Sequence, residues 1–338
     1  MNLDGKSVLV TGGTGSFGRQ FIRLILTRFQ PRKVVVVSRD EMKQWEMQQD
    51  PLFSGFPQLR FLLGDVRDIT RLELAFREVD VVVHAAALKQ VPAAEYNPLE
   101  CIHTNILGAE NVVRAALGAG VGQVIALSTD KAASPINLYG ASKLAADKIF
   151  VAANNLSGTI GTRFSTVRYG NVVGSRGSVI PFFRRLVREG AASLPITDPR
   201  MTRFWITLAQ GTEFVLSCLG MMRGGEIFVP KIPSMRVVEL AEVLAPGIPH
   251  RIVGVRPGEK LHEVMITEDD ARTTVALEDR YVIEPTGVWW TRRSFLEDGA
   301  GLVGEGFRYS SDGNDRWLGR EELLRMLGEL DRDGAAGH

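Results

Sequence analysis

A glycine-rich turn near the start of the chain restricts its fold more than any other feature. The apolar run Val8–Thr11 leads directly into the segment Gly12–Gly18, which holds four glycines and precedes a helical pattern. Residues without a Cβ allow a sharp reversal, close approach of the backbone to a pyrophosphate, and tight packing of the helix on the strand. The N-terminus of such a helix also presents free N–H groups to phosphate. This strand, turn and helix therefore predict a dinucleotide-binding βαβ unit.

Short apolar runs alternate with helical patterns through the first half of the chain. Strand-like runs cover residues 34–37, 60–63, 79–84, 123–128 and 165–169, and helical patterns cover residues 17–29, 99–119 and 139–154. The run Val34–Val37 is apolar throughout, as expected for a strand buried on both faces of a parallel sheet. Regular alternation of strand and helix predicts a doubly wound, Rossmann-type α/β fold with a parallel sheet.

The pattern changes after about Gly174. Glycine and proline become frequent beyond this point, and the apolar runs become shorter and more scattered. We therefore predict a Rossmann domain over residues 1–175, which carries the catalytic residues. A smaller mixed α/β lobe over residues 176–330 is expected mainly to bind substrate. The boundary is weak, so we leave room for the chain to cross between the two parts.

The composition restricts the classes of function. There are 40 Lys and Arg residues against 39 Asp and Glu, a net charge of +1, whereas nucleic-acid binding proteins usually carry a basic excess. The two cysteines, Cys101 and Cys218, have no metal-ligand spacing, so no metal site is expected. No apolar run reaches the ~20 residues of a membrane span, and the start of the chain does not resemble a signal peptide. We expect a soluble, cytoplasmic protein with no nucleic-acid or membrane partner.

The end of the second predicted strand indicates which dinucleotide is bound. The 2′-position of the cofactor ribose is read about 20 residues after the glycine turn. Ser38 and Arg39 stand there, and Lys43 follows one helical turn later, so a guanidinium and an ammonium are available for a 2′-phosphate. Asp40 leaves room for NAD, and a solvated pair of charges is the alternative, but we predict NADP. The pair Asp65–Val66, at the end of the third strand, is expected beside the adenine.

Three residues around the fifth strand have the pattern of a hydroxyl-oxidising site. Thr129 ends that strand, and Tyr139 and Lys143 lie four residues apart on one face of the next predicted helix. The Lys143 ammonium and a positive nicotinamide ring would both favour tyrosinate, which makes Tyr139 a base for a hydroxyl proton during hydride transfer. Thr129 would hydrogen-bond the same oxygen. A coincidental Tyr–Lys surface pair is the alternative, and the glycine turn argues against it.

Asp130 and Lys131 directly follow Thr129 and suggest a second chemical step. Simple alcohol oxidation does not need this additional acid and base. An elimination that follows the oxidation does need them. Oxidation of a sugar carbinol to a ketone acidifies the neighbouring C–H, so a base can remove that proton while an acid protonates the leaving hydroxyl. Lys131 must be neutral for this role, and we expect Lys143 and the oxidised nicotinamide to lower its pKa. A solvated Asp–Lys pair in a loop is the alternative.

These residues and their neighbours resemble a known family. The segments Thr11–Gly18, Ser38–Glu41, Ala87–Pro98 and Ser128–Lys143 are similar to the inverting UDP-N-acetylglucosamine 4,6-dehydratases of polysaccharide and pseudaminic acid biosynthesis. These enzymes belong to the extended short-chain dehydrogenase/reductase superfamily, whose glycine spacing the turn matches. The resemblance covers roughly residues 5–265. Retaining dehydratases typically carry Thr-Asp-Glu, so Lys131 and its short distance in sequence from the tyrosine indicate the inverting group.

The resemblance implies a reaction in which the cofactor is reduced and then reoxidised. Tyr139 would take the 4-hydroxyl proton while the C4 hydride passes to NADP⁺. Lys131 would remove the C5 proton, and Asp130 would protonate the departing 6-hydroxyl. Hydride return to C6 and reprotonation of C5 on the opposite face would convert UDP-N-acetylglucosamine to UDP-2-acetamido-2,6-dideoxy-β-L-arabino-hex-4-ulose. The enzyme would be a hydro-lyase.

The resemblance also implies binding residues and an assembly. The expected substrate contacts are Lys89, Lys131, Asn171, Val179 and Arg256, with the arginine as a clamp on the UDP diphosphate unless it is simply an exposed basic loop residue. The expected cofactor contacts are Gly12, Thr14, Gly15, Ser16, Phe17, Gly18, Ser38, Arg39, Asp40, Lys43, Asp65, Val66, Ala85, Ala86, Tyr139, Lys143 and Val172. Related enzymes associate through helices matching residues 99–119 and 139–154, so a homo-oligomer, a dimer or a hexamer, is expected.

Other functions fit parts of this pattern. A UDP-sugar 4-epimerase or a retaining 4,6-dehydratase would use the same turn, tyrosine and lysine. A dinucleotide-sensing Rossmann protein would bind the cofactor without any chemistry. The complete set of Thr129, Tyr139 and Lys143 argues against the sensor, which has no need of it.

Overall fold

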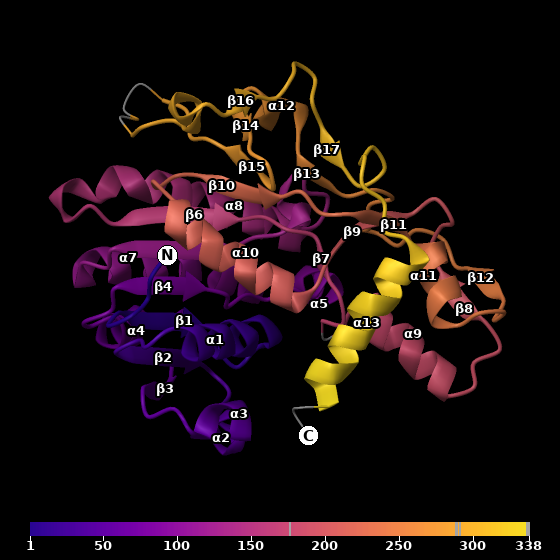
Figure 1. Ribbon diagram of the computed structural model, residues 1–338, viewed down its shortest axis with the longest axis horizontal. Coiled ribbons are helices and arrows are strands. Elements are labelled where there is room, and N and C mark those ends of the chain that lie inside the picture. Colours follow the sequence, from indigo (N-terminus) through magenta and orange to yellow (C-terminus); the bar gives the residue numbers. More distant parts are fainter. Residues whose placement is uncertain (176, 288–289, 291, 336–338) are drawn as a thin grey trace.

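A large central sheet with helices on both faces organises the molecule (Figure 1). The computed structural model describes residues 1–175, 177–287, 290 and 292–335. The strand order is β16-β14-β15-β10-β6-β5-β4-β1-β2-β3. Strands from β10 to β3 in this order pair in parallel, and β15, β14 and β16 extend the sheet with antiparallel pairs. The predicted doubly wound α/β fold with a mostly parallel sheet is confirmed.

The elements of the sheet and its cover have the following bounds. The strands are β1 (Ser7–Thr11), β2 (Lys33–Ser38), β3 (Leu59–Leu63), β4 (Val81–His84), β5 (Gln123–Leu127), β6 (Arg163–Val167), β10 (Ile227–Pro230), β14 (Thr274–Ala276), β15 (Arg280–Ile283) and β16 (Gly301–Leu302). The longer helices that cover the sheet are α1 (Ser16–Arg28), α2 (Glu41–Gln49), α4 (Ile69–Ala75), α7 (Gly108–Ala119), α8 (Leu138–Ala153) and α10 (Leu208–Met221). Shorter helical segments are α3 (Pro51–Ser54), α5 (Val91–Tyr96), α6 (Pro98–Ile102), α12 (Glu268–Ala271) and the turns Asp130–Ala132, Asn154–Leu156, Gly158–Ile160 and Phe295–Asp298.

Alternate residues of each central strand enter two separate cores. Val8 and Val10 of β1 pack in one core with Phe21 of α1, and α10 contributes to the same core. Leu9 lies between them in sequence and packs in the other core with Phe150 of α8, to which α4 and α7 also contribute. Both faces of these strands are therefore apolar because both are covered by helices.

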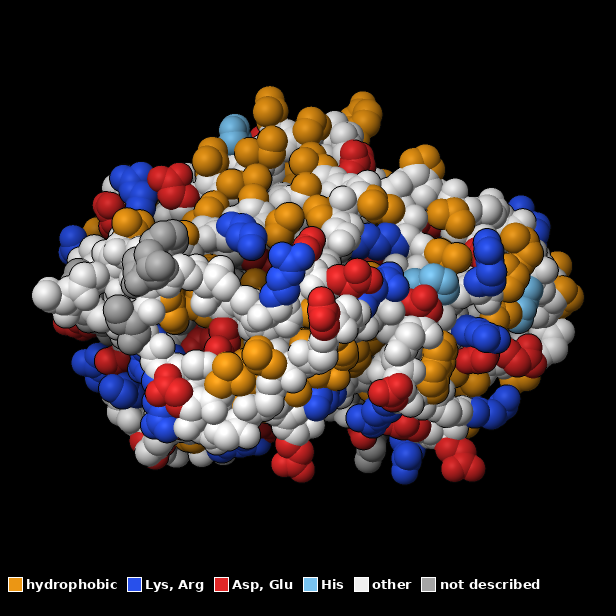
Figure 2. All heavy atoms as spheres, turned by 90° about the horizontal axis from the view of Figure 1, so that it is seen from above, with side chains coloured by type: hydrophobic (Ala, Val, Ile, Leu, Met, Phe, Trp, Pro, Cys, Tyr) orange, Lys and Arg blue, Asp and Glu red, His pale blue; other side chains and the backbone are white. Residues whose placement is uncertain are grey.

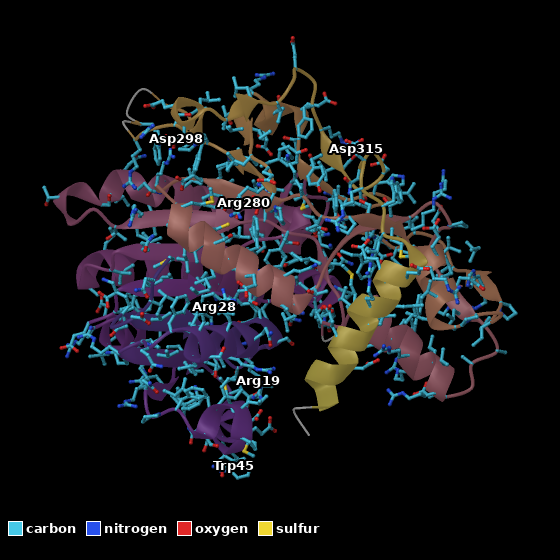
Figure 3. The ribbon with its side chains drawn as sticks, viewed as in Figure 1. Arg19, Arg28, Trp45, Arg280, Asp298 and Asp315 are labelled. Carbon is cyan, nitrogen blue, oxygen red and sulfur yellow. The ribbon has the colours of Figure 1, made fainter. Side chains whose placement is uncertain are left out.

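A surface ion pair joins the two helices of the first face. Arg28 at the end of α1 donates from Nη1 to Oε2 of Glu213 in α10 at 2.8 Å, and Figure 3 labels this arginine. Both side chains are about half exposed, so the pair contributes little to stability. The position of α10 therefore depends mainly on its apolar residues in the core.

The chain returns to the central sheet after residue 175. Helix α10 covers one face of that sheet, and β10, β14, β15 and β16 extend one edge of it. The chain thus crosses between the Rossmann sheet and the smaller part of the fold, which the weak predicted boundary allowed for. The division into residues 1–175 and 176–330 stays a prediction about folding units.

A smaller group of elements lies beside the sheet. It contains α9 (Val179–Arg188), α11 (Val237–Leu244), α13 (Arg320–Ala335), β7 (Asn171–Val172), β8 (Leu194–Ile196), β9 (Thr202–Ile206), β11 (Ser234–Arg236), β12 (His250–Ile252), β13 (Val264–Ile266) and β17 (Tyr309–Ser310). Part of this group packs in two apolar cores of its own, whereas Met265 and Ile266 of β13 and Tyr309 of β17 pack in the first core of the sheet. Figure 1 shows α9, α11, α13, β8 and β12 together at one end of the molecule. Pairing of β7 with β9 connects this group to the segment that follows β6.

The helix predicted over residues 99–119 is interrupted. A π-helical turn, His103–Leu107, separates α6 from α7 and buries Thr104 and Asn105. The Asn105 amide accepts from Leu88 N and donates to Leu88 O, both at 2.9 Å, and donates to Ser142 Oγ of α8 at 2.9 Å. A π turn inserts one residue into the helix and is common near functional sites. Here it fixes the loop after β4 against α8, which a 3.6-residue periodicity could not predict.

Charge and apolarity on the surface agree with the balanced composition. On the face seen in Figure 2, basic and acidic side chains are interspersed and do not form a patch of one sign. Among the helices that the structure describes, none has the length and apolar character needed to cross a membrane. The described part of the chain also contains no His, Cys, Asp and Glu grouping suited to a metal ion.

Candidate active site

A cavity of about 940 Å³ opens at the carboxyl ends of the parallel strands. Every residue predicted to contact the cofactor lines it, from the glycine turn after β1 to the segment after β6. Of the predicted catalytic and substrate-binding residues, those lining it are Lys89, Thr129, Lys131, Tyr139, Lys143 and Asn171. Ligands of doubly wound sheets bind in such crevices beyond the carboxyl ends of the strands. The cavity is therefore the candidate active site.

The glycine turn has the close contacts that its sequence predicted. Gly12 has φ of +66°, and a Cβ at this position would lie 2.8 Å from the backbone nitrogen of Ala86. A Cβ on Gly18 would collide with the backbone of Gly13, because α1 begins directly against the turn. Only glycine fits either position. The turn thus leaves the start of α1 open to the cavity, where a pyrophosphate can approach the backbone.

The residues after β2 form a small charged group at one end of the cavity. Asp40 caps α2 by accepting from Lys43 N at 3.0 Å, and the Lys43 ammonium lies 2.8 Å from the same carboxylate. The hydrogen bond from Lys43 lowers the pKa of Asp40. Arg39 Nη1 lies 3.7 Å from Asp65 Oδ2, and its side chain is about half exposed. Two cations and two carboxylates therefore stand where the ribose of a dinucleotide is expected.

Tyr139 and Lys143 enter the cavity from the first turns of α8. Burial raises the pKa of Tyr139 to about 12, although the charge of Lys131 and a hydrogen bond with Thr129 act against it. Burial lowers the pKa of Lys143. The charge of Lys143 is predicted to favour tyrosinate, but burial of the phenol is the larger effect on this pKa. The neighbouring cation that lowers this pKa most is Lys131.

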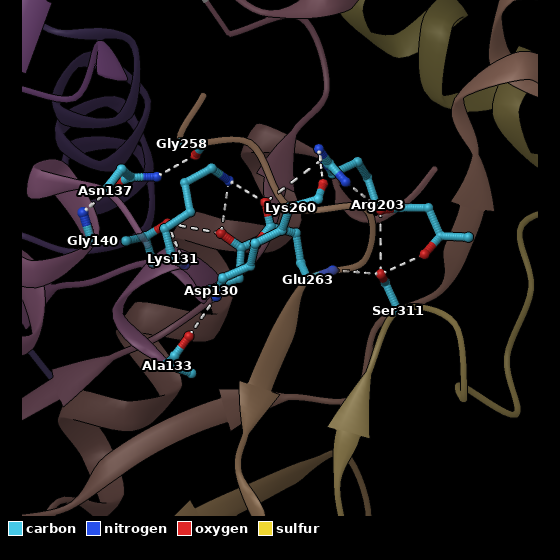
Figure 4. Close-up of polar contacts among 12 residues, drawn as sticks. Asp130, Lys131, Ala133, Asn137, Gly140, Arg203, Gly258, Lys260, Glu263 and Ser311 are labelled. Carbon is cyan, nitrogen blue, oxygen red and sulfur yellow. Dashed lines mark hydrogen bonds and ion pairs between the residues drawn. The ribbon is translucent and has the colours of Figure 1, made fainter. Parts of the chain in front are cut away.

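Lys131 is held by two carboxylates. Its Nζ lies 3.0 Å from Asp130 Oδ1 and 3.1 Å from Glu263 Oε1 (Figure 4). Burial alone would lower the pKa of Lys131, but the charges of Asp130 and Glu263 outweigh it and raise this pKa. The expectation of a lowered pKa was therefore wrong for the protein alone, because it counted nearby cations and missed Glu263. Asp130 lies behind the cavity wall, where burial raises the pKa of its carboxyl group.

Glu263 is a residue beside the site that sequence reasoning missed. It precedes β13 and is buried, and its Oε1 also lies 3.7 Å from Nε of Arg203. Nearby, Lys260 Nζ donates to Ala133 O at 2.6 Å. Within the stretch from Arg256 to Glu263, only the arginine is predicted to have a role. An isolated glutamate in such a charged stretch gives no sign that it will be buried.

The same segment closes against the start of α8. Asn137 Nδ2 donates to Gly258 O at 2.8 Å, while Asn137 Oδ1 caps the helix by accepting from Gly140 N at 2.7 Å. A Cβ on Gly140 would collide with the carbonyl oxygen of Lys131. The loop that carries Asp130 and Lys131, the helix that carries Tyr139 and the segment before Glu263 therefore form one hydrogen-bonded unit.

Two predicted substrate contacts do not line the cavity. Arg256 is two-thirds exposed, and its Nε lies 3.4 Å from Oε2 of Glu259. Val179 opens α9 and packs against the two smaller cores. The cavity is lined instead by several polar residues that the sequence pattern did not indicate: Gln90, Thr104, Ser175 and Ser178, together with Tyr169. Thr104 lies in the π turn and the others in segments between helices and strands, and their approach to the cavity depends on the tertiary fold.

The turn, the Tyr–Lys helix and the doubly wound sheet define a dinucleotide-binding enzyme of the short-chain dehydrogenase/reductase type. The sequence matches the family described as polysaccharide biosynthesis protein over residues 8–285. A UDP-N-acetylglucosamine 4,6-dehydratase (inverting) of Campylobacter jejuni is 54% identical over 327 residues, which is 95% of this chain and 97% of that protein. A UDP-glucose 4-epimerase of Rickettsia akari is 39% identical over 96% of both chains. The chain therefore belongs to the polysaccharide biosynthesis protein family.

Solved structures show the same architecture. The X-ray structure of Pen from Bacillus thuringiensis superposes with a TM-score of 0.87 at 35% identity, covering 98% of this chain and 99% of that chain. DesIV, a dTDP-glucose 4,6-dehydratase from Streptomyces venezuelae solved with NAD bound, gives a TM-score of 0.67 at 27% identity, covering 75% and 86%. Neighbours of this fold thus bind nicotinamide dinucleotides.

Proposed function

We propose that this protein is an inverting UDP-N-acetylglucosamine 4,6-dehydratase, a hydro-lyase that removes water from the sugar and inverts C5. The observation that carries the proposal is the 3.0 Å contact between Lys131 Nζ and Asp130 Oδ1, beside Tyr139 at the cavity wall. Elimination needs an acid and a base together, whereas oxidation and reduction at C4 alone need neither of these two residues. The name and near full-length similarity of the Campylobacter relative support the same reaction.

The proposed roles combine the position of each side chain with the resemblance to the inverting dehydratases. Tyr139 takes the proton of the 4-hydroxyl, and Thr129 hydrogen-bonds the same oxygen. Lys143 lies one helical turn after the tyrosine, is buried, and stabilises tyrosinate and the bound cofactor. Lys131 removes the C5 proton in its amine form, and Asp130 protonates the departing 6-hydroxyl in its acid form. Reprotonation of C5 on the opposite face inverts that centre.

The cavity fits a nicotinamide dinucleotide, which supplies reversible hydride transfer when it is bound. The fit rests on Gly12, where a Cβ would fill the approach to the backbone of Ala86, and on the open N-terminus of α1. The residues proposed to hold it are the cofactor contacts predicted above, all of which line this cavity.

We propose NADP over NAD as the cofactor. NAD-preferring sites use a free carboxylate for the ribose hydroxyls. Here the Asp40 carboxylate caps α2 and pairs with Lys43, so it is already engaged. Arg39 is the half-exposed guanidinium at the cavity wall, and its planar fork suits a 2′-phosphate. The NAD seen in DesIV keeps NAD as the alternative.

For the substrate, we propose that Lys89 and Asn171 contact the UDP-sugar inside the cavity. Arg256 and Val179 stay predictions, since both lie outside the cavity wall. The exposed guanidinium of Arg256 belongs to the loop that contacts Asn137 through Gly258. A diphosphate that extends from the cavity along this loop would meet the arginine.

A UDP-sugar 4-epimerase is the second candidate, favoured by the name of the Rickettsia relative. To separate the two, purified protein is incubated with UDP-N-acetylglucosamine and NADP⁺ or NAD⁺, and the products are analysed by mass spectrometry and NMR. A product lighter by one water supports the dehydratase. A 4-epimer of unchanged mass would replace our proposal with the epimerase, and cofactor binding without turnover would indicate a sensor.

We further propose that the protein is cytoplasmic and forms a homo-oligomer, a dimer or a hexamer. Cytoplasm is where nucleotide sugars and NADP are available in solution. For the oligomer, the segment from α5 to α7 exposes Tyr96, Leu99 and Leu107, and Ile136 is exposed just before α8. Light scattering coupled to size exclusion tests the assembly, and a monomeric mass at micromolar concentration would contradict it.

A further inference from the structure

Glu263 has no role in the reaction as described so far, yet it contacts the proposed base. Its Oε1 lies 3.1 Å from Lys131 Nζ and 3.7 Å from Arg203 Nε (Figure 4). The other oxygen, Oε2, is buried without a hydrogen-bond partner among the described residues, as is Oδ2 of Asp130. A buried, incompletely satisfied carboxylate is costly, so its presence beside a reactive lysine requires an explanation.

The position of Glu263 is fixed from both sides. Its backbone N–H donates to Ser311 Oγ at 2.9 Å, and Ser311 N donates to Glu263 O at 2.8 Å. The Arg203 guanidinium donates to the carbonyl oxygens of Thr202, Lys260 and Leu261 at 2.7 to 3.1 Å. The carboxylate therefore holds a fixed distance from the Lys131 ammonium, and Arg203 balances its charge.

Several charged groups face this carboxylate, and they come from different elements. They are Asp130 and Lys131 from the turn after β5, Arg203 from β9 and Lys260 from its own segment. Arg168, from the segment after β6, acts on Lys260, and Nδ1 of His262 lies 2.8 Å from Thr202 Oγ1. Arg168 pairs with Asp147 and Asp270, both at 3.3 Å, so its charge is compensated elsewhere. Two carboxylates contact Lys131. Asp130 takes part in the proposed proton transfer, and Glu263 does not.

The elimination requires Lys131 as an amine and Asp130 as a carboxylic acid. The two residues reach this state from the ion pair if one proton moves from Lys131 Nζ to Asp130 Oδ1 across their 3.0 Å contact. No proton enters or leaves the protein in this step. The pair must therefore carry a single proton: with none there is no acid, and with two there is no base.

We propose that Glu263 is a positioning residue whose fixed negative charge keeps one proton on the Asp130–Lys131 pair and holds Lys131 Nζ in place for the C5 proton. This inference rests on the proposed dehydratase reaction. A negative charge beside the pair opposes loss of its proton. The raised pKa values of both Asp130 and Lys131 agree with this, and Glu263 contributes to each.

The proposal makes a directional claim about pH. Neutralising Glu263 removes a negative charge from both partners, so the pKa values of Asp130 and Lys131 must both fall. A charge in close contact typically shifts a pKa by about 1–3 units. The acid and alkaline limits of the dehydration rate should therefore both move to lower pH in Glu263→Gln, so that the whole profile shifts in one direction.

The experiment measures kcat for dehydration against pH in the wild type, Glu263→Gln, Glu263→Asp and Glu213→Gln. Glu263→Gln keeps the shape and should shift the profile to lower pH by about 1 unit or more. Glu263→Asp keeps the charge but shortens the side chain, so its limits should stay near those of the wild type with a lower maximum. Glu213→Gln removes a distant surface carboxylate and should change neither. A lower but unmoved profile in Glu263→Gln would show a merely structural role and overturn the proposal.

A second readout needs no turnover. The ¹³Cγ resonance of Asp130, assigned by its loss in Asp130→Asn, is titrated in the ligand-free wild type and in Glu263→Gln. We expect the titration of Asp130 to move to lower pH in the variant, and an unchanged midpoint in a folded variant would overturn the proposal.

If the wild type makes no dehydration product, the proposed function fails, while this titration still decides whether Glu263 controls the pair. If Glu263→Gln does not fold, kcat of Glu263→Asp is compared with kcat of the wild type. An unchanged maximum of kcat in Glu263→Asp would contradict the proposal that Glu263 positions Lys131.

Discussion

Burial and neighbouring charge act in opposite directions on the reactive side chains. Burial lowers the pKa of Lys143, whereas two carboxylates keep the Lys131 ammonium protonated although it is also enclosed. The chemistry proposed for Lys131 therefore begins with transfer of its proton to Asp130. Sequence spacing could place these residues at one site, but it could not give the charge of Lys131, because Glu263 comes from a segment 132 residues further along the chain.

Replacement of Lys131 by alanine tests the proposed base. We expect Lys131→Ala to lose dehydration by a factor of about 100 or more, since general bases contribute factors of this order. Nucleotide binding should persist, because the glycine turn and Arg39 are untouched. Product formation is followed by mass spectrometry and cofactor affinity by calorimetry. Near-normal turnover in a folded Lys131→Ala protein would remove this residue from the mechanism.

The proposed preference for NADP depends on one guanidinium, that of Arg39. Arg39→Ala should weaken NADP⁺ binding by roughly 10-fold or more, because a charge-assisted hydrogen bond contributes about 1.5–3 kcal/mol. NAD⁺ has no 2′-phosphate, so its dissociation constant should change little. Calorimetric titration of both cofactors into wild type and variant gives the ratio. Equal losses for the two cofactors would contradict a 2′-phosphate contact.

At the scale of elements, the strands and helices of the first half could be predicted, and the close approaches between elements could not. Buried apolar runs and the glycine turn predicted β1, β2 and α1 because local sequence determines them. The π turn at His103–Leu107 and the contact of Asn137 with Gly258 depend on partners distant in sequence. The same limit explains why Arg256 and Val179, predicted as substrate contacts, lie outside the cavity wall.

Helix α8 offers a test of one such close approach. Gly140→Ala adds a methyl group against the carbonyl oxygen of Lys131, so either α8 or the Asp130–Lys131 turn must move. We expect a destabilisation of about 1–3 kcal/mol, as is usual for overpacking, and a larger loss of kcat than of cofactor affinity. Gly118→Ala in α7 is the matched control, since a Cβ there meets no atom within 4 Å. An equally active and stable Gly140→Ala protein would show that this contact is not needed.

At the scale of the whole molecule, we propose that a nearly neutral chain binds its anionic ligands through local cations. The total charge is +1, and basic and acidic side chains are interspersed on the face seen in Figure 2. Arg39, Lys43 and Lys131 line the cavity, and each has a carboxylate within 4 Å. Net charge could be predicted from the sequence, but the pairing of these cations could not.

The free energy of unfolding should depend on pH through a buried, neutral histidine, His84. Burial and the charge of Lys143 lower the pKa of His84 to about 3, and Thr11 Oγ1 lies 2.8 Å from its Nδ1. The unfolded state binds a proton near pH 6.5, so the free energy of unfolding falls as pH drops below this value. Between about pH 7 and pH 5 the loss attributable to this residue should be about 2 kcal/mol. Urea unfolding of wild type and His84→Gln at both pH values measures it, and identical pH dependence in the two proteins would refute the assignment.

The fate of C5 in deuterated water tests the central claim most directly. Wild-type protein is incubated in D₂O with UDP-N-acetylglucosamine and NADP⁺, and the product is analysed by NMR for deuterium and configuration at C5. Removal of the C5 proton by Lys131 and reprotonation on the opposite face predict a 4-keto-6-deoxy sugar with one deuterium at C5 and the L-arabino configuration. A product that keeps the original configuration at C5, or a 4-epimer with no deuterium there, would contradict the account.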